Sequence, residues 1–121
     1  MSGRVNEKTA SIYTGQLTDE NKVNIQLVVI IDFFLTLYDA ITGTILGGRD
    51  AQPVINQNHV VISSSGFITW NLQEADNALI NQSLDTELHI ALFTGHYTSA
   101  DGARPFKHIF PFRVVNLTKV L

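Results

Sequence analysis

The sequence predicts an all-β protein built as an antiparallel β-sandwich, and three observations lead to this fold class. Val, Ile and Thr, whose β-branched side chains suit pleated surfaces better than helices, make up 33 of the 121 residues. No window keeps the apolar spacing of an amphipathic helix for three turns. About seven short strand patterns are separated by turn signals, as in an immunoglobulin-like sandwich. A jelly roll or a small barrel is the alternative.

The first half of the chain predicts a short edge strand over residues 9–13 and the longest strand over residues 24–39. In the long strand, Phe33, Leu35 and Leu37 share one face, and Phe34, Thr36 and Tyr38 share the other. Residues 28–31 are apolar on both faces, so this strand is expected to be central or to cross between two layers. Turns are expected at Thr42-Gly43 and Gly47-Gly48.

The middle of the chain predicts a β-hairpin formed by residues 60–63 and 67–72, with Gly66 supplying a positive φ. Ile68, Trp70 and Leu72 would then face the core. A short helical segment over residues 74–79 follows, and it is too short to be stable by itself.

Two further strands are expected near the end of the chain, over residues 87–97 and 106–117, with a loop at residues 99–104 between them. The earlier strand places Leu88, Ile90 and Leu92 on one face and His89, Ala91 and Phe93 on the other. One face of the later strand carries Phe106, His108, Phe110, Phe112 and Val114, which is expected to be a core stripe. Pro111 predicts an edge position or a bulge, because proline cannot donate to a ladder.

The chain length fits one domain. Residues 1–12 are polar enough to form a flexible arm, and residues 13–121 are expected to form the sandwich.

The polar start MSGRVNEK predicts no signal peptide. The longest apolar run, residues 28–38, is interrupted by Asp32 and is shorter than the ~20 residues of a membrane span. Synthesis and folding in a cytoplasm are therefore expected.

The composition excludes several kinds of function. Eight Lys and Arg against eleven Asp and Glu give a formal charge of −3, which argues against nucleic-acid binding. Hydrophobic residues make up 45% of the chain, which argues against disorder. The absence of cysteine rules out disulfides and thiolate metal sites. Charged residues are only 16% of the chain, against about 25% in an average protein, and a small soluble monomer usually carries more.

No metal site is expected from the histidines. The four are His59, His89, His96 and His108. None forms a close pair, and the seven-residue separation of His89 and His96 places them on opposite faces of a regular strand. Asp32, between apolar neighbours, is expected to mark a bulge or an exposed strand end, because unpaired aspartate is rarely buried.

The remaining polar motifs predict turns. Residues 63–66 do not form the strand-to-helix elbow of a serine nucleophile, and Gly47-Gly48 lacks the lysine and helix of a phosphate loop. Gly48-Arg49-Asp50 is interpreted as a simple turn. The aspartates expected to close loops are Asp39, Asp50, Asp76, Asp85 and Asp101. We therefore expect no catalytic residue, no cofactor and no metal, and the protein is not expected to be an enzyme.

Four segments together suggest a family. They are residues 35–46 (LTLYDAITGTIL), 66–80 (GFITWNLQEADNALI), 87–93 (ELHIALF) and 112–120 (FRVVNLTKV). The chain resembles small Ig-like or β-sandwich proteins encoded in the structural gene modules of tailed bacteriophages, over residues 13–120. The motifs are structural, and the resemblance carries over no active site.

The resemblance implies a virion protein, and capsid cement or decoration is the favoured role. Sparse surface charge suits a protein whose surface becomes interface. A polar arm with a short strand could add to a neighbour's sheet edge, so Arg4, Val5, Ile12 and Tyr13 are the expected partner contacts. The implied partners are the major capsid protein and further copies of this chain, such as a trimer. The implied location is the virion, and the host cytoplasm during assembly.

Two other functions are considered. A neck or tail adaptor belongs to the same structural class. A carbohydrate-binding module for host attachment would need an exposed aromatic groove formed by Tyr13, Tyr38 or Tyr97.

Overall fold

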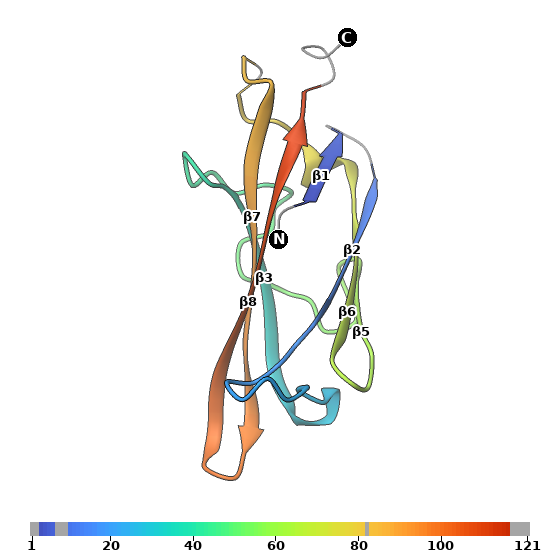
Figure 1. Ribbon diagram of the computed structural model, residues 1–121, viewed down its shortest axis with the longest axis vertical. Helices are drawn as coiled ribbons and strands as arrows, with labels where there is room; N and C mark the ends of the chain where they lie inside the picture. The colour runs from blue at the N-terminus through green and yellow to red at the C-terminus, as the bar shows by residue number, and fades with distance from the viewer. Residues whose placement is uncertain (1–2, 7–9, 82, 117–121) are drawn as a thin grey trace.

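The computed structural model describes residues 3–6, 10–81 and 83–116, and these fold into two β-sheets packed face to face (Figure 1). The larger sheet has the strand order β1-β8-β7-β3-β4, and the smaller has the order β2-β6-β5. All pairings are antiparallel except that of β1 with β8. The prediction of an antiparallel β-sandwich is confirmed, and the described strands do not close into a barrel.

The larger sheet is dominated by a long hairpin of β7 (Thr86–Ser99) and β8 (Gly102–Val115). Ser99 pairs with Gly102, so the turn is tighter than the expected loop, and Gly102 has a φ of +99°. Its closed end extends past the rest of the molecule (Figure 1). With fourteen residues each, these strands are longer than β3 (Ile30–Asp39), which has ten. The expectation that residues 24–39 form the longest strand is therefore wrong.

The chain crosses between the sheets just before β3. The amide of Ile25 bonds to Leu17 and that of Leu27 bonds to Ser64, which ties residues 25–27 to the smaller sheet. A 3₁₀ turn (Leu27–Val29) then leads into β3, which lies between β7 and β4 (Gln52–Pro53). Of the two predicted positions, the central one is confirmed for β3, whereas residues 24–29, which were expected to be strand, instead carry the chain from one sheet to the other. The expected bulge is also confirmed, because the pairing register shifts between Ile30 and Asp32.

The smaller sheet contains β2 (Ser11–Gln16), β5 (Val60–Ile62) and β6 (Phe67–Leu72). Strand β2 lies at its edge, as predicted, and β5 and β6 form the predicted hairpin. Gly66 closes this hairpin with a φ of +80°, and a Cβ at this position would collide with the carbonyl oxygen of Ile25. A 3₁₀ turn (Glu74–Asn77) follows where the short helical segment was expected.

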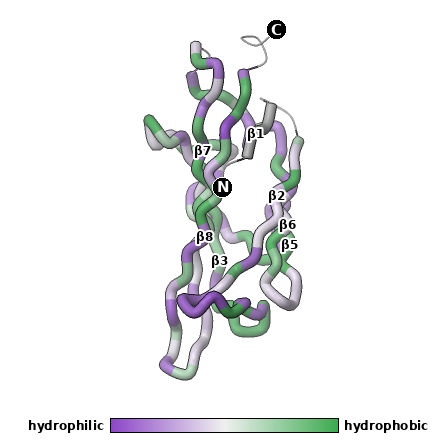
Figure 2. The backbone as a smooth tube through the Cα atoms, in the orientation of Figure 1, coloured by the Kyte–Doolittle hydropathy of each residue, from purple (hydrophilic) through white to green (hydrophobic). Residues whose placement is uncertain are grey.

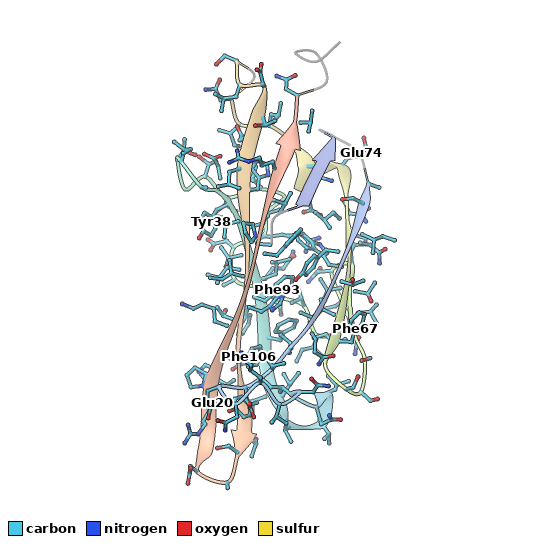
Figure 3. All side chains as sticks on the ribbon, viewed as in Figure 1. Glu20, Tyr38, Phe67, Glu74, Phe93 and Phe106 are labelled. Atoms are coloured by element: carbon cyan, nitrogen blue, oxygen red, sulfur yellow. The ribbon has the colours of Figure 1, made fainter. Side chains whose placement is uncertain are left out.

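The core lies between the two sheets and is rich in aromatic rings. The ring of Trp70 meets that of Phe93 edge-on at 5.9 Å, and Phe33 stacks on Phe93 at 5.5 Å. Trp70 and Phe93 are fully buried, and Phe93 lies between the sheets in Figure 3. The inward faces predicted for residues 33–37 and 68–72, and the core stripe of β8, are confirmed.

Strand β1 (Gly3–Asn6) pairs in parallel with the last part of β8, from Phe112 to Val115. Before Phe112, no described strand pairs with β8 on the side away from β7. Pro111 therefore lies at a free edge, in agreement with the position predicted from its missing N–H.

Residues 1, 2 and 7–9 of the expected arm lie outside the described residues, as does Leu117 at the end of the expected last strand.

Candidate functional site

The outer face of the larger sheet carries a cluster of apolar side chains. Tyr38, Ile90 and Pro111 lie side by side across β3, β7 and β8 in one row of the pairing register. Leu92 and Ile109 are neighbours in the next row. Their sequence neighbours point into the core, so these side chains point outward, and all five are partly or fully exposed. Figure 3 shows Tyr38 on the side of the larger sheet that faces away from the smaller sheet.

We call this surface the outer apolar face. It consists of Phe34, Tyr38, Leu88, Ile90, Leu92, Ile109 and Pro111. Antiparallel sheets with one solvated face normally alternate between apolar residues inside and polar residues outside. In the first part of β7 this order is reversed, because Glu87 and His89 are buried while Leu88 and Ile90 face outward. Residues of both kinds follow one another along β7 and β8 in Figure 2, so the tertiary structure decides which kind is inside.

The outer face of the smaller sheet is more polar, which makes it a useful comparison. Its paired strands present Thr14, Thr69 and Asn71 between a few exposed apolar side chains. Val61 on this sheet and Ile109 on the larger one have the same exposed fraction, 53%. The exposed apolar side chains of the smaller sheet lie in three different rows of the pairing register (Ile12, Val61 and Phe67), whereas those of the larger sheet share rows.

A hollow of ≈ 440 Å³ lies at one end of the outer apolar face. Its lining residues are Phe34, Thr94, Gly95, His96, Pro105, Phe106 and Lys107. A Cβ atom at Gly95 would collide with the carbonyl oxygen of Asp32 and lie 2.7 Å from Phe106 Cζ. Only glycine therefore fits at this position of β7. Lys107 is exposed at the rim and forms no ion pair within the part of the chain that the structure describes. The hollow has the size of a small-ligand site or of an anchor for a partner's side chain.

The four residues expected to contact a partner lie on two strands, β1 and β2. Arg4 and Val5 lie in β1, opposite Arg113 and Val114 of the same chain, so β1 extends this chain's own sheet. Ile12 on β2 faces outward and is 68% exposed. Tyr13 instead turns into the gap between the sheets and stacks on Phe110 at 3.9 Å.

The hydroxyl of Tyr13 lies 2.5 Å from His108 Nε2. Both groups are half-buried, and burial raises the pKa of Tyr13 and lowers the pKa of His108. Both shifts favour the neutral forms, in which the tyrosine O–H donates to the imidazole. Tyr13 therefore joins the two sheets.

Arg49 is buried, although the sequence around it predicts only a simple turn. Its guanidinium meets the Asp76 carboxylate with Nε–Oδ1 and Nη2–Oδ2 distances of 2.6 and 3.2 Å. It also donates to the Asn58 carbonyl and lies 5.4 Å from the centre of the Trp70 ring. The prediction that residues 48–50 form a turn and nothing more is wrong, because Arg49 is buried and pairs with Asp76. A lone Arg beside two glycines carries no signal of this in the sequence.

A second buried polar cluster consists of Asp39, Glu87 and His89. Asp39 and His89 are register partners across β3 and β7. His89 Nε2 lies 2.6 Å from Glu87 Oε1. One ligand-type atom from each of the three residues lies within 4.8 Å of the others. The wide separation of Asp39 and His89 along the chain hides this cluster, which arises only when the two strands pair.

Comparison with known protein families finds no family that matches this chain, and comparison with curated proteins finds no relative. Within the described residues, no helix is long and apolar enough to span a membrane.

Proposed function

We propose that this protein is a structural component of a tailed-bacteriophage virion, a cement or decoration protein that binds the capsid shell through its outer apolar face. The observation that carries the proposal is the clustering of Tyr38, Leu88, Ile90, Leu92 and Ile109 on a solvent-facing sheet. Large contiguous apolar patches are rare on the surfaces of monomeric proteins, and where they occur they mark interaction sites.

Two further features support the proposal. Charged residues are only 16% of the chain, and the centre of an interface is depleted of charge. The resemblance of residues 35–46 and 66–80 to phage β-sandwich proteins points to the same class. The proposed partners are the major capsid protein and further copies of this chain, and the proposed location is the virion, with the host cytoplasm as the place of assembly.

The rim of the face indicates what the partner surface contributes. Along the outward side of β8, Ile109 and Pro111 are bracketed by the exposed cations Lys107 and Arg113. A capsid surface with an apolar centre and acidic groups around it complements this arrangement. The hollow beside Phe34 would receive an apolar side chain of that partner.

The proposal is tested by co-sedimentation of the purified protein with empty capsids, comparing I109K with V61K. Both positions are 53% exposed on strands, so both variants should fold, and only Ile109 lies on the outer apolar face. We expect I109K to weaken capsid binding at least tenfold and V61K to bind like the wild type. Equal binding by all three proteins, or no binding by the wild type, would overturn the proposal.

The adaptor alternative is separated by labelling intact particles. A cement protein covers the shell, whereas a neck or tail adaptor is confined to one vertex. Capsids that lack the protein should lose resistance to heat or dilution if it acts as cement.

The geometry does not favour the carbohydrate-binding alternative. Tyr97 is buried and bonds to Glu20, and Tyr13 is held against Phe110. Of the three tyrosines considered for a sugar platform, Tyr38 alone lies on the outer apolar face.

A further inference from the structure

One side of the larger sheet is left uncovered by the described strands. The smaller sheet packs on the inner side, and the outer apolar face lies on the opposite side (Figure 1). Ile109 on this face is 53% exposed, and apolar side chains gathered on a surface are normally covered by a partner. The edges of the sheet and the charges around the face decide how a second copy of this chain can cover it.

The edges of the larger sheet are unsuited to adding a strand from a second copy. At one edge, β4 has only two residues, and one of them is Pro53. At the other edge, the free part of β8 contains Pro105 and Pro111. Because backbone N–H groups alternate between the two sides of a strand, prolines six residues apart remove donors from the same side, which is the open one. A second copy is therefore expected to join through the face of this sheet.

The charges around the outer apolar face lie on opposite sides of it. Lys107 and Arg113 are exposed on the outward side of β8, and neither forms an ion pair in the described part of the chain. On β3, the side chain of Asp32 is 35% exposed, and its ion-pair partner is the exposed His96. Asp50 is exposed just before β4, the neighbour of β3. The β8 side of the face is therefore cationic, and the β3–β4 side is acidic.

This distribution of charge decides how two identical faces can pack. A two-fold axis in the plane of the face and parallel to the strands places β8 of one copy over β3 of the other. Lys107 then lies one outward row of the pairing register from Asp32 of the second copy, within reach of a lysine side chain. An axis across the strands instead places β8 over β8 and brings Lys107 towards Arg113 of the second copy. Because like charges repel, the axis parallel to the strands is favoured.

We propose that two copies of this protein form a two-fold symmetric dimer in solution, in which the two outer apolar faces pack together. The axis follows β7, the strand between β8 and β3. Ile90 and Leu92 of β7 lie at the centre of the interface, and Lys107 of each copy lies beside Asp32 of the other. Two sheets that pack face to face are about 10 Å apart, with their strands inclined by about 30°.

The size of the face indicates the strength of this dimer. Strand β3 has ten residues, which gives a length of about 34 Å. Three strands of that length, about 4.8 Å apart, cover about 500 Å² on each copy, or about 1,000 Å² in total. This area is at the lower limit for a specific interface, so the dimer is weak and reversible.

The dimer goes beyond the proposed function and does not depend on it. In the free protein, a second copy covers the outer apolar face. A capsid surface that binds the same face has to displace that copy, which a weak dimer allows.

Sedimentation equilibrium of the full chain, from about 2 to about 200 µM, tests the dimer over the range expected for a weak interface. The average mass of the wild type should rise from that of one chain towards that of two. I109K should stay monomeric, and V61K, equally exposed on the smaller sheet, should dimerise like the wild type. A wild type that is monomeric throughout, or dimerisation of I109K equal to that of the wild type, would overturn the proposal.

Charge reversal tests the orientation of the two copies. D32K and K107D should each weaken the dimer at least about tenfold, because each brings like charges together twice across the axis. The double variant D32K/K107D restores opposite charges and should dimerise within about threefold of the wild type. D101K is the control, because Asp101 is exposed in the turn between β7 and β8. A double variant that dimerises no better than either single variant would overturn the proposal.

The outcomes also separate the dimer from capsid binding. A wild type that binds capsids but stays monomeric overturns the dimer and leaves the proposed function standing. A wild type that dimerises but does not bind capsids supports the dimer and overturns the proposed function. Thermal unfolding shows whether each variant is folded, and if D32K is not, the comparison of I109K with V61K still decides whether the dimer forms through this face.

Discussion

The hydroxyl of Tyr13 meets His108 Nε2 at 2.5 Å, and this contact joins the edge strand of the smaller sheet to β8 of the larger one. The two residues are 95 positions apart in the chain. Phe110 stacks on the tyrosine ring from the same strand as His108. This edge of the sandwich is therefore closed by one polar contact and one aromatic contact.

The His108 contact predicts a dependence of stability on pH. Burial lowers the pKa of His108, so the folded protein binds its proton less readily than the unfolded chain does. The resulting contribution is complete above the unfolded pKa of about 6.5 and is lost as the pH falls through the lower folded value. Urea unfolding of the wild type and of H108Q measures this contribution to the free energy of unfolding. The two measurements are made at about pH 7.5 and about pH 5.0, above and below the unfolded pKa of about 6.5. The stability advantage of the wild type should shrink at the lower pH, and an equal difference at both values would contradict the prediction.

Removing the hydroxyl of Tyr13 should weaken the junction without creating a cavity. We expect Y13F to lower the free energy of unfolding by about 1 kcal/mol, because His108 loses a partner while the ring still packs on Phe110. Y38F is the control, because Tyr38 lies on the outer apolar face. Denaturant unfolding near neutral pH measures both, and a larger loss in Y38F would argue against the contact.

The Arg49–Asp76 pair should be important for folding. Substitution of Arg49 by Met leaves the Asp76 carboxylate buried without its main cation, which costs about 3–5 kcal/mol. R104M is the matched control, because Arg104 forms exposed pairs with Glu20 and Asp101 that are worth at most about 1 kcal/mol. In thermal and urea unfolding, R49M should have a much lower free energy of unfolding than R104M. Similar stabilities would show that the buried pair is dispensable.

Two glycine substitutions separate steric overlap from backbone strain. G95A should cost more than about 3 kcal/mol, because its methyl group would meet the backbone of Asp32 and the Phe106 ring. G43A should cost about 1 kcal/mol, because Gly43 has a φ of +74° but no atom lies within 4 Å of the place that an alanine methyl group would occupy. The free energies of unfolding of the two variants give the comparison. A milder effect in G95A than in G43A would show that β7 can shift at the hollow.

Much of the architecture could be predicted because it follows from local patterns. The alternation of Phe33, Leu35 and Leu37 specified the buried face of β3. The Gly66 turn specified the β5–β6 hairpin. Asp32 between apolar neighbours marked the bulge. Each of these signals needs only the two-residue period of a strand or the φ of a glycine, so a single sequence contains them.

The polar interior could not be predicted in the same way. Strand β7 has apolar residues on one face and mixed residues on the other, and a two-residue period does not say which face is inside. The pairing with β3 and β8 buries Glu87 and His89 and leaves Leu88 and Ile90 outside. The same pairing brings Asp39 to His89, although the two residues are far apart in the sequence.

The sequence by itself determined the all-β class, the positions of most strands along the chain and the sparse charge, because composition, alternation and turn residues are local properties. The tertiary structure decided which strand faces are exposed, which charges meet in the interior, and that residues 3–6 pair with β8. These features depend on contacts between residues far apart in the chain, whose free energies are realised only when the two sheets pack. The outer apolar face and the Asp39–Glu87–His89 cluster both arise at that step.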